Sequence, residues 1–302
     1  MTQQHDSAVF TQSLQGKTVV VFGAGAPLED WNNGKAAAVA YARAGAQVVC
    51  VDKDLAAAKR SADHILGEGG EALALEADVC DTETVEKTVT LAIEHFGKID
   101  VLHNNVGIAP AGGPLDIDDA LFQKTMDINV GSILRTTRAV LPHFLKQGSG
   151  VITNISSLAS IRWSGYSYFA YYASKAALNQ ATVATALEFA DKGIRANAIL
   201  PGVIDTPLVY QQIAAQYDSI EHIKEQRANA VPMKRTGTPW DIANAAVFLA
   251  SDAAGFITGV CLPVDGGHSC AMPGMRRTTY STIVKHNPTI LLEPNIYRPQ
   301  QT

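Results

Sequence analysis

Short apolar runs alternate along this chain with longer segments in which apolar residues recur at helical spacing. The runs are apolar at nearly every position, which is typical of strands buried on both faces of a sheet. Such strands, separated by helices, predict a parallel sheet covered on both sides. The predicted strands are residues 17–22, 47–51, 71–75, 99–103, 150–155, 194–200 and 259–264, and the predicted helices are residues 34–44, 54–66, 82–96, 118–145, 169–191 and 239–250.

Seven strands of this kind predict a single α/β domain, a Rossmann-type doubly wound parallel sheet that binds ligands at the carboxyl ends of its strands. We expect this domain over residues 16–268. Residues 1–15 are polar and predict a flexible N-terminal arm. Residues 269–302 form a C-terminal extension with scattered prolines and the apolar patch Ile290-Leu291-Leu292. The extension is either a disordered tail or a segment that packs on a neighbouring subunit or over the site.

The composition of the chain argues against several classes of binding partner. The chain has 302 residues, of which 47% are hydrophobic and 18% charged, as in an ordinary globular protein. Its formal net charge of -5 argues against nucleic acid or an anionic membrane as the main partner. The four cysteines lack metal-ligand spacing, and no apolar run reaches transmembrane length. We therefore expect a cytoplasmic protein that acts on small molecules without a metal.

Tyr171 and Lys175 are the first candidate chemistry. They stand four residues apart in a predicted helix, so their side chains lie over the same face. A neighbouring ammonium favours the phenolate and lowers the pKa of a tyrosine, which makes the tyrosine a usable general base. A tyrosine and a lysine at this spacing more often lie on a helix surface without a catalytic role, so the surrounding motifs decide how the pair is interpreted.

A glycine-rich turn follows the first predicted strand. Gly23, Gly25 and Gly34 precede an alanine-rich helix, where a pyrophosphate can approach the backbone and the helix N-terminus. The second strand ends at Asp52, whose carboxylate can bind the ribose hydroxyls of an adenosine. The same carboxylate repels a 2′-phosphate, and the glycine loop holds no arginine to receive one. The cofactor is therefore predicted to be NAD rather than NADP.

Further polar residues stand at the ends of later strands. Asp78 and Val79 follow the third strand, where they could bracket the adenine ring. Asn105, Val106 and Gly107 end the fourth strand, where a tight turn would lie along the cofactor. Each is weak evidence alone, because strand ends are commonly polar.

Taken together, the motifs resemble those of the short-chain dehydrogenase/reductase family over roughly residues 15–268. Individually they are weak, but a chance match in this order and spacing is implausible. The motifs are the glycine turn, Asp52, Asp78-Val79, NNVG at 104–107, Asn129 in DINVGS, ISS at 155–157, YYASK at 171–175, PGVIDTP at 201–207 and the segment from 235 to 267.

The resemblance implies a role for each catalytic residue. Tyr171 would be the acid/base that takes the proton of the substrate hydroxyl. Lys175 would lower the Tyr171 pKa and hold the nicotinamide ribose. Ser157 would hydrogen-bond the reacting oxygen, with Ser156 structural, and Asn129 would kink its helix and hold a water that joins Lys175 to bulk solvent. Pro201, Gly202, Ile204 and Thr206 would lie along the cofactor, the last two at the carboxamide.

The glycine turn departs from the family pattern. About five extra residues precede Gly34, and Asn32 occupies the position that the middle glycine usually holds. Asp30 and Trp31 in this insertion could lie against the pyrophosphate or the adenine. Some family members carry a similar longer loop, so we still expect cofactor binding, with Asn32 among the contacts.

The substrate side is rich in aromatic residues. Trp163, Tyr166, Tyr168 and Phe169 either line a pocket for a ring-bearing substrate or pack the helix start or a subunit contact. Residues 109–114 could form the opposite wall, and residues 208–231 resemble the mobile lid of the family. Arg162 and Arg227 could bind a substrate carboxylate, although solvated arginines are commoner.

The leading prediction is an NAD-dependent dehydrogenase that interconverts a secondary alcohol and a ketone, with a cyclic or aromatic substrate. A carbonyl or 3-oxoacyl reductase is the alternative enzyme, and the wider Tyr–Lys spacing of enoyl reductases disfavours that class. An inactive NAD-binding regulator is a third hypothesis, which the intact catalytic set disfavours. The helices at 118–145 and 169–191 carry more apolar surface than the sheet needs, and the resemblance implies a homotetramer or a homodimer.

Overall fold

A computed structural model describes residues 12–26, 30–207 and 219–271 of the chain. Most of the predicted arm, residues 208–218 of the predicted lid, and the extension from residue 272, including its Ile290 patch, lie outside the described residues. The chain divides into two units, residues 1–269 and 270–302, and the architecture given below belongs to the first.

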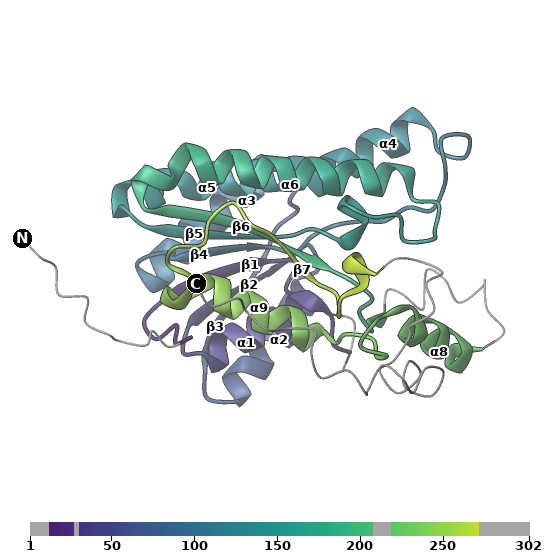
Figure 1. The fold of residues 1–302 in the computed structure, drawn as a ribbon. Coiled ribbons are helices and arrows are strands. Elements are labelled where there is room, and N and C mark those ends of the chain that lie inside the picture. Colours follow the sequence, from purple (N-terminus) through teal and green to yellow (C-terminus); the bar gives the residue numbers. More distant parts are fainter. Residues whose placement is uncertain (1–11, 27–29, 208–218, 272–302) are drawn as a thin grey trace, which may run out of the picture. The chain divides into compact units, whose positions relative to one another are not determined.

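Seven parallel strands form one sheet in the order β3-β2-β1-β4-β5-β6-β7 (Figure 1), so the predicted doubly wound fold is confirmed. The strands are β1 (Thr18–Phe22), β2 (Gln47–Asp52), β3 (Glu71–Glu76), β4 (Val101–Asn104), β5 (Gly150–Ile155), β6 (Ile194–Pro201) and β7 (Cys261–Val264). Strand β7 begins two residues later than predicted. Gly259 has a φ of 75°, and the Val260 amide donates to the Asn197 side chain rather than to a strand partner.

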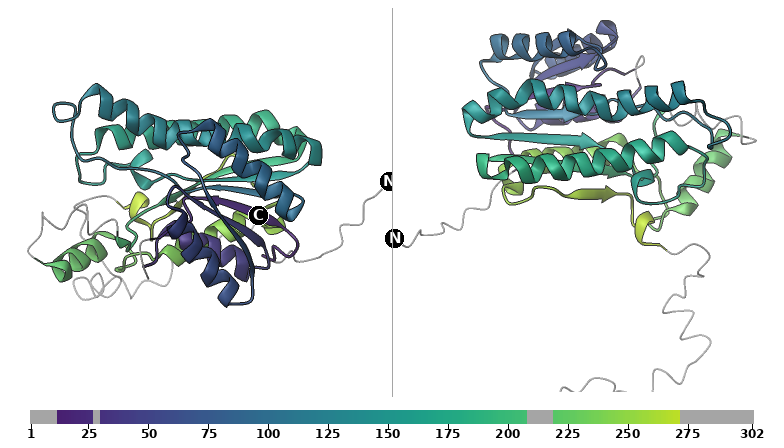
Figure 2. Two further views of the ribbon diagram at one scale, coloured as in Figure 1. Left: turned by 180° about the vertical axis from the view of Figure 1, so that it is seen from behind. Right: turned by 90° about the horizontal axis from the view of Figure 1, so that it is seen from above.

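Helices cover both faces of the sheet (Figures 1 and 2). One face carries α1 (Asn33–Arg43), α2 (Leu55–Gly67) and α9 (Pro239–Ala250), and the other carries α3 (Thr82–Phe96), α5 (Ser132–Gln147) and α6 (Phe169–Phe189). The shorter helices are α4 (Asp119–Met126), the π turn η1 (Asp127–Gly131), α8 (Ile220–Ala230) and the 3₁₀ turns η2 (Leu158–Ser160), η3 (Ala190–Lys192), η5 (Asp252–Ala254) and η6 (His268–Cys270).

The side chains of β1 show why the strands are apolar at every position. Val19 and Val21 lie in the core under α1 and α9, whereas Val20 and Phe22 lie in the core under α3 and α5. Successive residues of a strand point to opposite faces, and here both faces are buried. Each such side chain contributes about 2 kcal/mol of burial free energy.

The predicted helix over residues 118–145 is divided in the structure. Its central turn, Asp127–Gly131, is π-helical and lies between α4 and α5. A π turn widens the helix by one residue, which shifts the side chains that follow it. The apolar periodicity does not reveal the break, because it continues on both sides.

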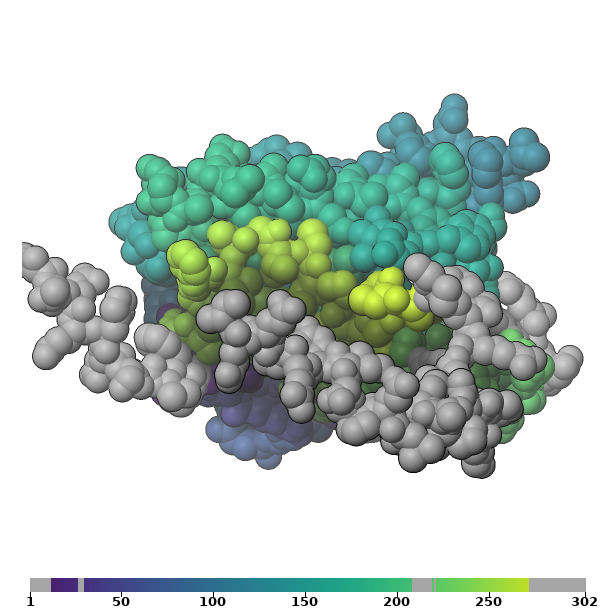
Figure 3. Space-filling view, viewed as in Figure 1, coloured from purple at the N-terminus to yellow at the C-terminus, as the bar shows by residue number. Residues whose placement is uncertain are grey.

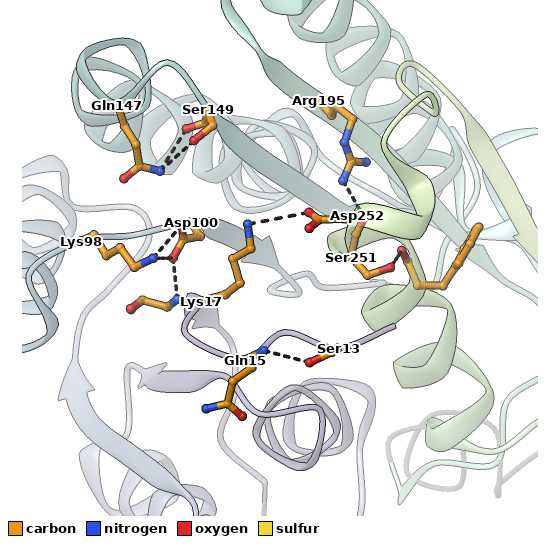
Figure 4. Close-up of polar contacts among 12 residues, drawn as sticks. Ser13, Gln15, Lys17, Lys98, Asp100, Gln147, Ser149, Arg195, Ser251 and Asp252 are labelled. Carbon is orange, nitrogen blue, oxygen red and sulfur yellow. Dashed lines mark hydrogen bonds and ion pairs between the residues drawn. The ribbon is translucent and has the colours of Figure 1, made fainter. Parts of the chain in front are cut away.

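Polar contacts close the amino ends of the strands, at the edge opposite the expected ligand site (Figure 4). The Asp100 carboxylate accepts a hydrogen bond from the Thr18 amide at 2.7 Å and pairs with Lys98 Nζ at 3.1 Å. Lys17 Nζ lies 3.7 Å from the Asp252 carboxylate. The open edge for ligands is therefore the carboxyl end.

Strand β7 forms one edge of the sheet and pairs only with β6 among the described strands. Its residues are partly exposed, and the space-filling view shows them at the surface between α6 and α9 (Figure 3). Strand β3 forms the other edge and is also partly exposed, whereas the five strands between these edges are largely buried.

His103 on β4 carries a pH-dependent part of the stability. It is fully buried, its Nδ1 lies 2.9 Å from the Tyr41 hydroxyl, and its Nε2 has no hydrogen-bond partner among the described residues. Burial lowers the pKa of His103 to about 3. The unfolded chain has a histidine pKa of about 6.5. Between these values the unfolded chain binds a proton that the folded chain does not, so stability falls as pH falls.

We expect His103→Gln to reduce the pH dependence of the unfolding free energy by about 1.4 kcal/mol per pH unit between pH 4 and 6, which corresponds to one proton. Urea unfolding at several pH values measures it. The exposed His95→Gln serves as the control and should leave the slope unchanged. Equal slopes in wild type and His103→Gln would show that His103 is protonated in the folded state.

Candidate functional site

The four predicted catalytic residues meet at the carboxyl ends of the central strands. Tyr171 and Lys175 lie in the first two turns of α6, and Ser157 follows β5. Asn129 lies in the π turn η1 and reaches α6 through its amide, which donates to Ser174 Oγ at 2.9 Å. Three separate segments therefore build one site.

Lys175 is buried, with 2% of its surface exposed. Its Nζ donates to the carbonyl oxygen of Ile155, at the end of β5, at 2.7 Å. The same Nζ lies 5.8 Å from the centroid of the Tyr171 ring. Burial lowers the pKa of Lys175 to about 8, because a charged ammonium is poorly solvated there.

Tyr171 is half-buried, and two opposing effects act on its phenol. Burial raises the pKa of Tyr171, and the hydrogen bond with the Ser157 side chain lowers it. The net direction is upward, so the lowering expected from Lys175 has to act against desolvation. Ser157 Oγ also accepts a hydrogen bond from the Ala159 amide at 3.1 Å, which fixes the hydroxyl beside the phenol.

The Asn129 amide joins the site to the loop after β4. Asn129 Oδ1 accepts a hydrogen bond from the Ile108 amide at 2.8 Å, and its Nδ2 donates to the Ile108 carbonyl at 2.9 Å. A Cβ atom at Gly107 would lie 3.2 Å from Lys175 Nζ and 3.3 Å from Asn129 Oδ1. The lack of a side chain at Gly107 therefore leaves space between these two polar groups.

The glycine turn places the start of α1 directly on the end of β1. A Cβ atom at Gly34 would overlap the carbonyl oxygen of Gly23, so only glycine fits there. Asn105 Nδ2 donates to the same carbonyl at 3.0 Å. The amides of Asn33 and Gly34 have no acceptor among the described residues. Free amides at a helix N-terminus suit a phosphate, so this turn fits a dinucleotide.

Asp52 lies at the end of β2, where it holds the glycine turn. Its Oδ2 accepts a hydrogen bond from the Gly25 amide at 3.0 Å. Asn32 caps α1 by accepting from the Lys35 amide at 2.9 Å, and it donates to the Gly25 carbonyl at 2.7 Å. The side chain at position 32 thus supports the turn through two hydrogen bonds.

The other predicted cofactor residues also lie beyond strand ends. Asp78 Oδ1 accepts from the Cys80 amide at 2.8 Å, and Val79 is buried in the core. The segment after β6 is held by the Gly202 amide, which donates to Val264, and by a bridge between Ile204 and Gly237. The full set at or after the ends of β3, β4 and β6 is Asp78, Val79, Asn105, Val106, Gly107, Pro201, Gly202, Ile204 and Thr206.

The aromatic residues before Tyr171 divide into two groups. The Tyr168 ring lies edge-on to Tyr171 with centroids 6.4 Å apart, and Tyr166 lies 5.9 Å from Tyr168. Trp163 instead stacks on Tyr172 at 5.2 Å and is 70% exposed. Tyr168 and Tyr166 are therefore the ones placed to contact a substrate at Tyr171.

The remaining substrate-side predictions fall in different places. Gly112 pairs with Tyr168, which puts residues 109–114 beside the aromatic segment. Half-buried Arg227 on α8 donates to the Ile204 carbonyl at 3.2 Å, within the predicted cofactor segment. Arg162 donates to the Ser269 carbonyl at 3.1 Å. Phe169 pairs with Phe122 on α4 at 6.2 Å.

The structure adds positioning groups that the sequence did not indicate. They are the Ile155 carbonyl under Lys175, Ser174 and the Ile108 backbone at Asn129, and Arg60, whose guanidinium donates to the Ala26 carbonyl of the glycine turn at 3.0 Å. Backbone carbonyls leave no signal in a sequence, and Arg60 is far from the turn along the chain. Within the described residues no three metal-ligating side chains cluster, and no helix is long and apolar enough to cross a membrane.

The arrangement agrees with known proteins. A family model described as enoyl-(acyl carrier protein) reductase matches residues 32–269. The 2,5-dichloro-2,5-cyclohexadiene-1,4-diol dehydrogenase LinX of Sphingobium indicum is 36% identical over 256 residues, covering 85% of this chain and 97% of LinX. The chain belongs to the short-chain dehydrogenase/reductase family. The 7alpha-hydroxysteroid dehydrogenase of Escherichia coli is likewise 36% identical, over 84% of this chain and 94% of its own.

Solved structures of short-chain dehydrogenases share the fold. One from Burkholderia xenovorans is 37% identical with a TM-score of 0.80, covering 86% of this chain and 98% of its own. A 7 alpha-hydroxysteroid dehydrogenase with NADH and 7-oxo glycochenodeoxycholic acid is 35% identical with a TM-score of 0.76, over 85% and 95%. A protein from Beutenbergia cavernae described as an NAD(P) dependent gluconate 5-dehydrogenase, with NADP bound at low occupancy, is 33% identical with a TM-score of 0.78, over 86% of this chain and 99% of its own.

Proposed function

We propose that this short-chain dehydrogenase/reductase interconverts a ring-bearing secondary alcohol and its ketone, with NAD as the cofactor. The observation that carries the proposal is the Tyr171 phenol, hydrogen-bonded to Ser157 and lying over the buried ammonium of Lys175. A donor for the reacting oxygen, an acid/base and a fixed cation are the groups that proton transfer to or from a carbinol requires.

Bound NAD supplies the acceptor for the hydride. In the oxidation direction Tyr171 takes the proton of the substrate hydroxyl, and Ser157 donates a hydrogen bond to the same oxygen. The charge of Lys175 favours the phenolate and so opposes the desolvation that raises the Tyr171 pKa. In the reduction direction Tyr171 returns the proton to the carbonyl oxygen.

The buried proton of Tyr171 needs a path to solvent. Lys175 and Asn129 both face the space left by the missing side chain of Gly107. A water molecule held there between Lys175 Nζ and Asn129 Oδ1 would relay the proton. The Asn129 amide is fixed in place by the Ile108 backbone, because its Oδ1 accepts from the Ile108 amide and its Nδ2 donates to the Ile108 carbonyl.

Asp52 supports NAD as the cofactor. Relatives of similar overall likeness hold NADH in one case and NADP in another, so the choice rests on this chain's own residues. The Asp52 carboxylate is held at the end of β2 by the Gly25 amide, where the adenosine ribose would lie. A fixed negative charge attracts ribose hydroxyls and repels a 2′-phosphate.

Two observations support a ring-bearing substrate. The Tyr168 and Tyr166 rings form an apolar surface at Tyr171. The relatives include dehydrogenases named for a cyclohexadiene diol and for a hydroxysteroid, both of which are cyclic alcohols. A carbonyl or 3-oxoacyl reductase is the second candidate, because the same residues serve the reverse reaction. We place the enzyme in the cytoplasm as a homotetramer or homodimer.

We expect Tyr171→Phe to lower turnover about a thousandfold, because the acid/base is removed. The dissociation constant for NAD, measured by calorimetry, should stay within about twofold, because the ring and Lys175 remain. Undiminished turnover would falsify the proposed mechanism. Tyr172→Phe is the matched control, since that hydroxyl bonds only Ser164 and Tyr166 among the described residues, and it should keep most activity.

Replacement of Asp52 tests the cofactor choice. Asp52→Ser should shift the ratio of kcat/KM for NAD over NADP toward NADP by about a hundredfold, because a like-charge repulsion of a few kcal/mol is removed. Steady-state kinetics with both cofactors measures the ratio. The exposed Asp63→Asn on α2 controls for net charge, and an equal shift in that variant would count against Asp52 as the selector.

A further inference from the structure

We propose that Trp31 is a positioning residue for the dinucleotide. Its indole fixes the longer glycine turn onto the helices beside it, and so holds Asn32 and Gly25 where the adenosine half of the cofactor binds. The inference rests on the proposed NAD function and concerns an insertion for which the family pattern provides no contacts.

The Trp31 ring contacts three elements of the structure. Its centroid lies 4.8 Å from that of Trp240 on α9 and 5.1 Å from that of His64 on α2, the latter edge-on at 90°. Lys35 Nζ on α1 lies 4.7 Å from the Trp31 ring. We call Trp31, Trp240, His64 and Lys35 the Trp31 latch. Aromatic pairs of this geometry contribute about 0.5–1.5 kcal/mol each beyond their burial.

Lys35 shows that the latch is built around Trp31. Only 5% of its surface is exposed, and no carboxylate lies within ion-pair distance of it among the described residues. A buried ammonium without a counterion is unfavourable. Among the described residues, the face of the Trp31 indole stabilises this charge through a cation–π interaction.

Two charged side chains, Arg43 and Glu68, contact the Trp240 and His64 members of the latch. The Arg43 guanidinium lies 4.8 Å over the Trp240 ring and binds the Glu68 carboxylate through two hydrogen bonds of 2.8 and 2.6 Å. His64 Nε2 lies 3.1 Å from the same carboxylate. The rings are thus fixed from both sides, so the Trp31 position is determined by α1, α2 and α9 together.

A short chain of hydrogen bonds connects Trp31 to the cofactor loop. The next residue, Asn32, donates to the Gly25 carbonyl at 2.7 Å, and the Gly25 amide donates to Asp52 at 3.0 Å. Asn32 also caps α1, whose first amides are free to bind phosphate. An insertion raises the entropy lost when a loop becomes ordered. Anchoring Trp31 fixes Asn32 and, through it, Gly25 before the ligand arrives, which strengthens binding by preorganisation.

A positioning role of Trp31 should change the dissociation constants for the cofactor and leave the catalytic constants nearly unchanged. We expect Trp31→Ala to raise the dissociation constants for NAD and for ADP-ribose about tenfold each, because both share the adenosine and pyrophosphate. The kcat at saturating NAD and the KM for the alcohol should stay within about twofold, because Tyr171 and Lys175 do not touch the latch. Calorimetry gives the dissociation constants, and steady-state kinetics gives the rest. Trp31→Phe, which retains a ring, should bind more tightly than Trp31→Ala.

Two controls separate the latch from general destabilisation. Phe144→Leu, in the core of α5 at the amino end of β5, should lower the Tm without changing NAD affinity. The double variant Trp31→Ala/Asn32→Ala should lose less NAD affinity than the product of the two single losses, because the residues act as one unit. If Trp31→Ala does not fold, the same dissociation constants are measured for Trp31→Leu, which also removes the aromatic ring.

The outcomes are distinct. A folded Trp31→Ala that binds NAD and ADP-ribose as wild type does overturns the inference and leaves the proposed function intact. The inference is also overturned if Phe144→Leu, at the same Tm as Trp31→Ala, loses the same amount of NAD affinity. Wild-type protein that binds neither ligand overturns both the proposed function and the inference.

Discussion

The enclosure of the Lys175 ammonium is the constraint on which the site depends. A charge that is 2% exposed needs polar partners, and the structure supplies the Ile155 carbonyl at the end of β5. That contact fixes α6 against the sheet and brings Tyr171 beside Ser157. Burial also lowers the pKa of Lys175 to about 8, so its charge is retained at neutral pH but is readily lost in mild base. The fold positions one cation, and the proposed acid/base chemistry follows from where that cation lies.

The cofactor end is governed by a second constraint, the close approach of α1 to β1. Gly34 leaves no room for a side chain against Gly23, so the turn can close only one way. Asp52 bonds the Gly25 amide, which means that the residue expected to select the cofactor also shapes the loop. Asn32 bears a side chain where the family pattern has glycine, and its two hydrogen bonds tie that side chain into the turn. The proposed cofactor choice and the loop conformation are therefore coupled through these few atoms.

The sequence predicted the sheet and its helices because strands buried on both faces are apolar at every position, as β1 is. It also predicted which residues meet, since parallel strands place their carboxyl ends, and hence Asp52, Gly107 and Ser157, at one edge. It could not predict the π turn at Asn129, because the apolar periodicity continues through it. Nor could it distinguish Tyr168, which faces Tyr171, from Trp163, which stacks on Tyr172, because the orientation of loop side chains depends on tertiary packing. The Trp31 ring also contacts α2 and α9, which are distant from it in sequence, and no local pattern reveals these contacts.

Hydride transfer from a secondary alcohol to NAD is the central claim, and reduction of the cofactor measures it most directly. Purified protein would be assayed at the nicotinamide absorbance with NAD and with NADP, against aromatic carbinols, cyclic and steroid alcohols, sugar alcohols and hydroxy acids. Turnover with NAD on a ring-bearing alcohol is the predicted result, since Asp52 and the Tyr168 surface both require it. Preference for NADP would contradict the role of Asp52, and preference for a sugar or hydroxy acid would contradict the aromatic surface. Binding of NAD without turnover in either direction would contradict the catalytic role of Tyr171.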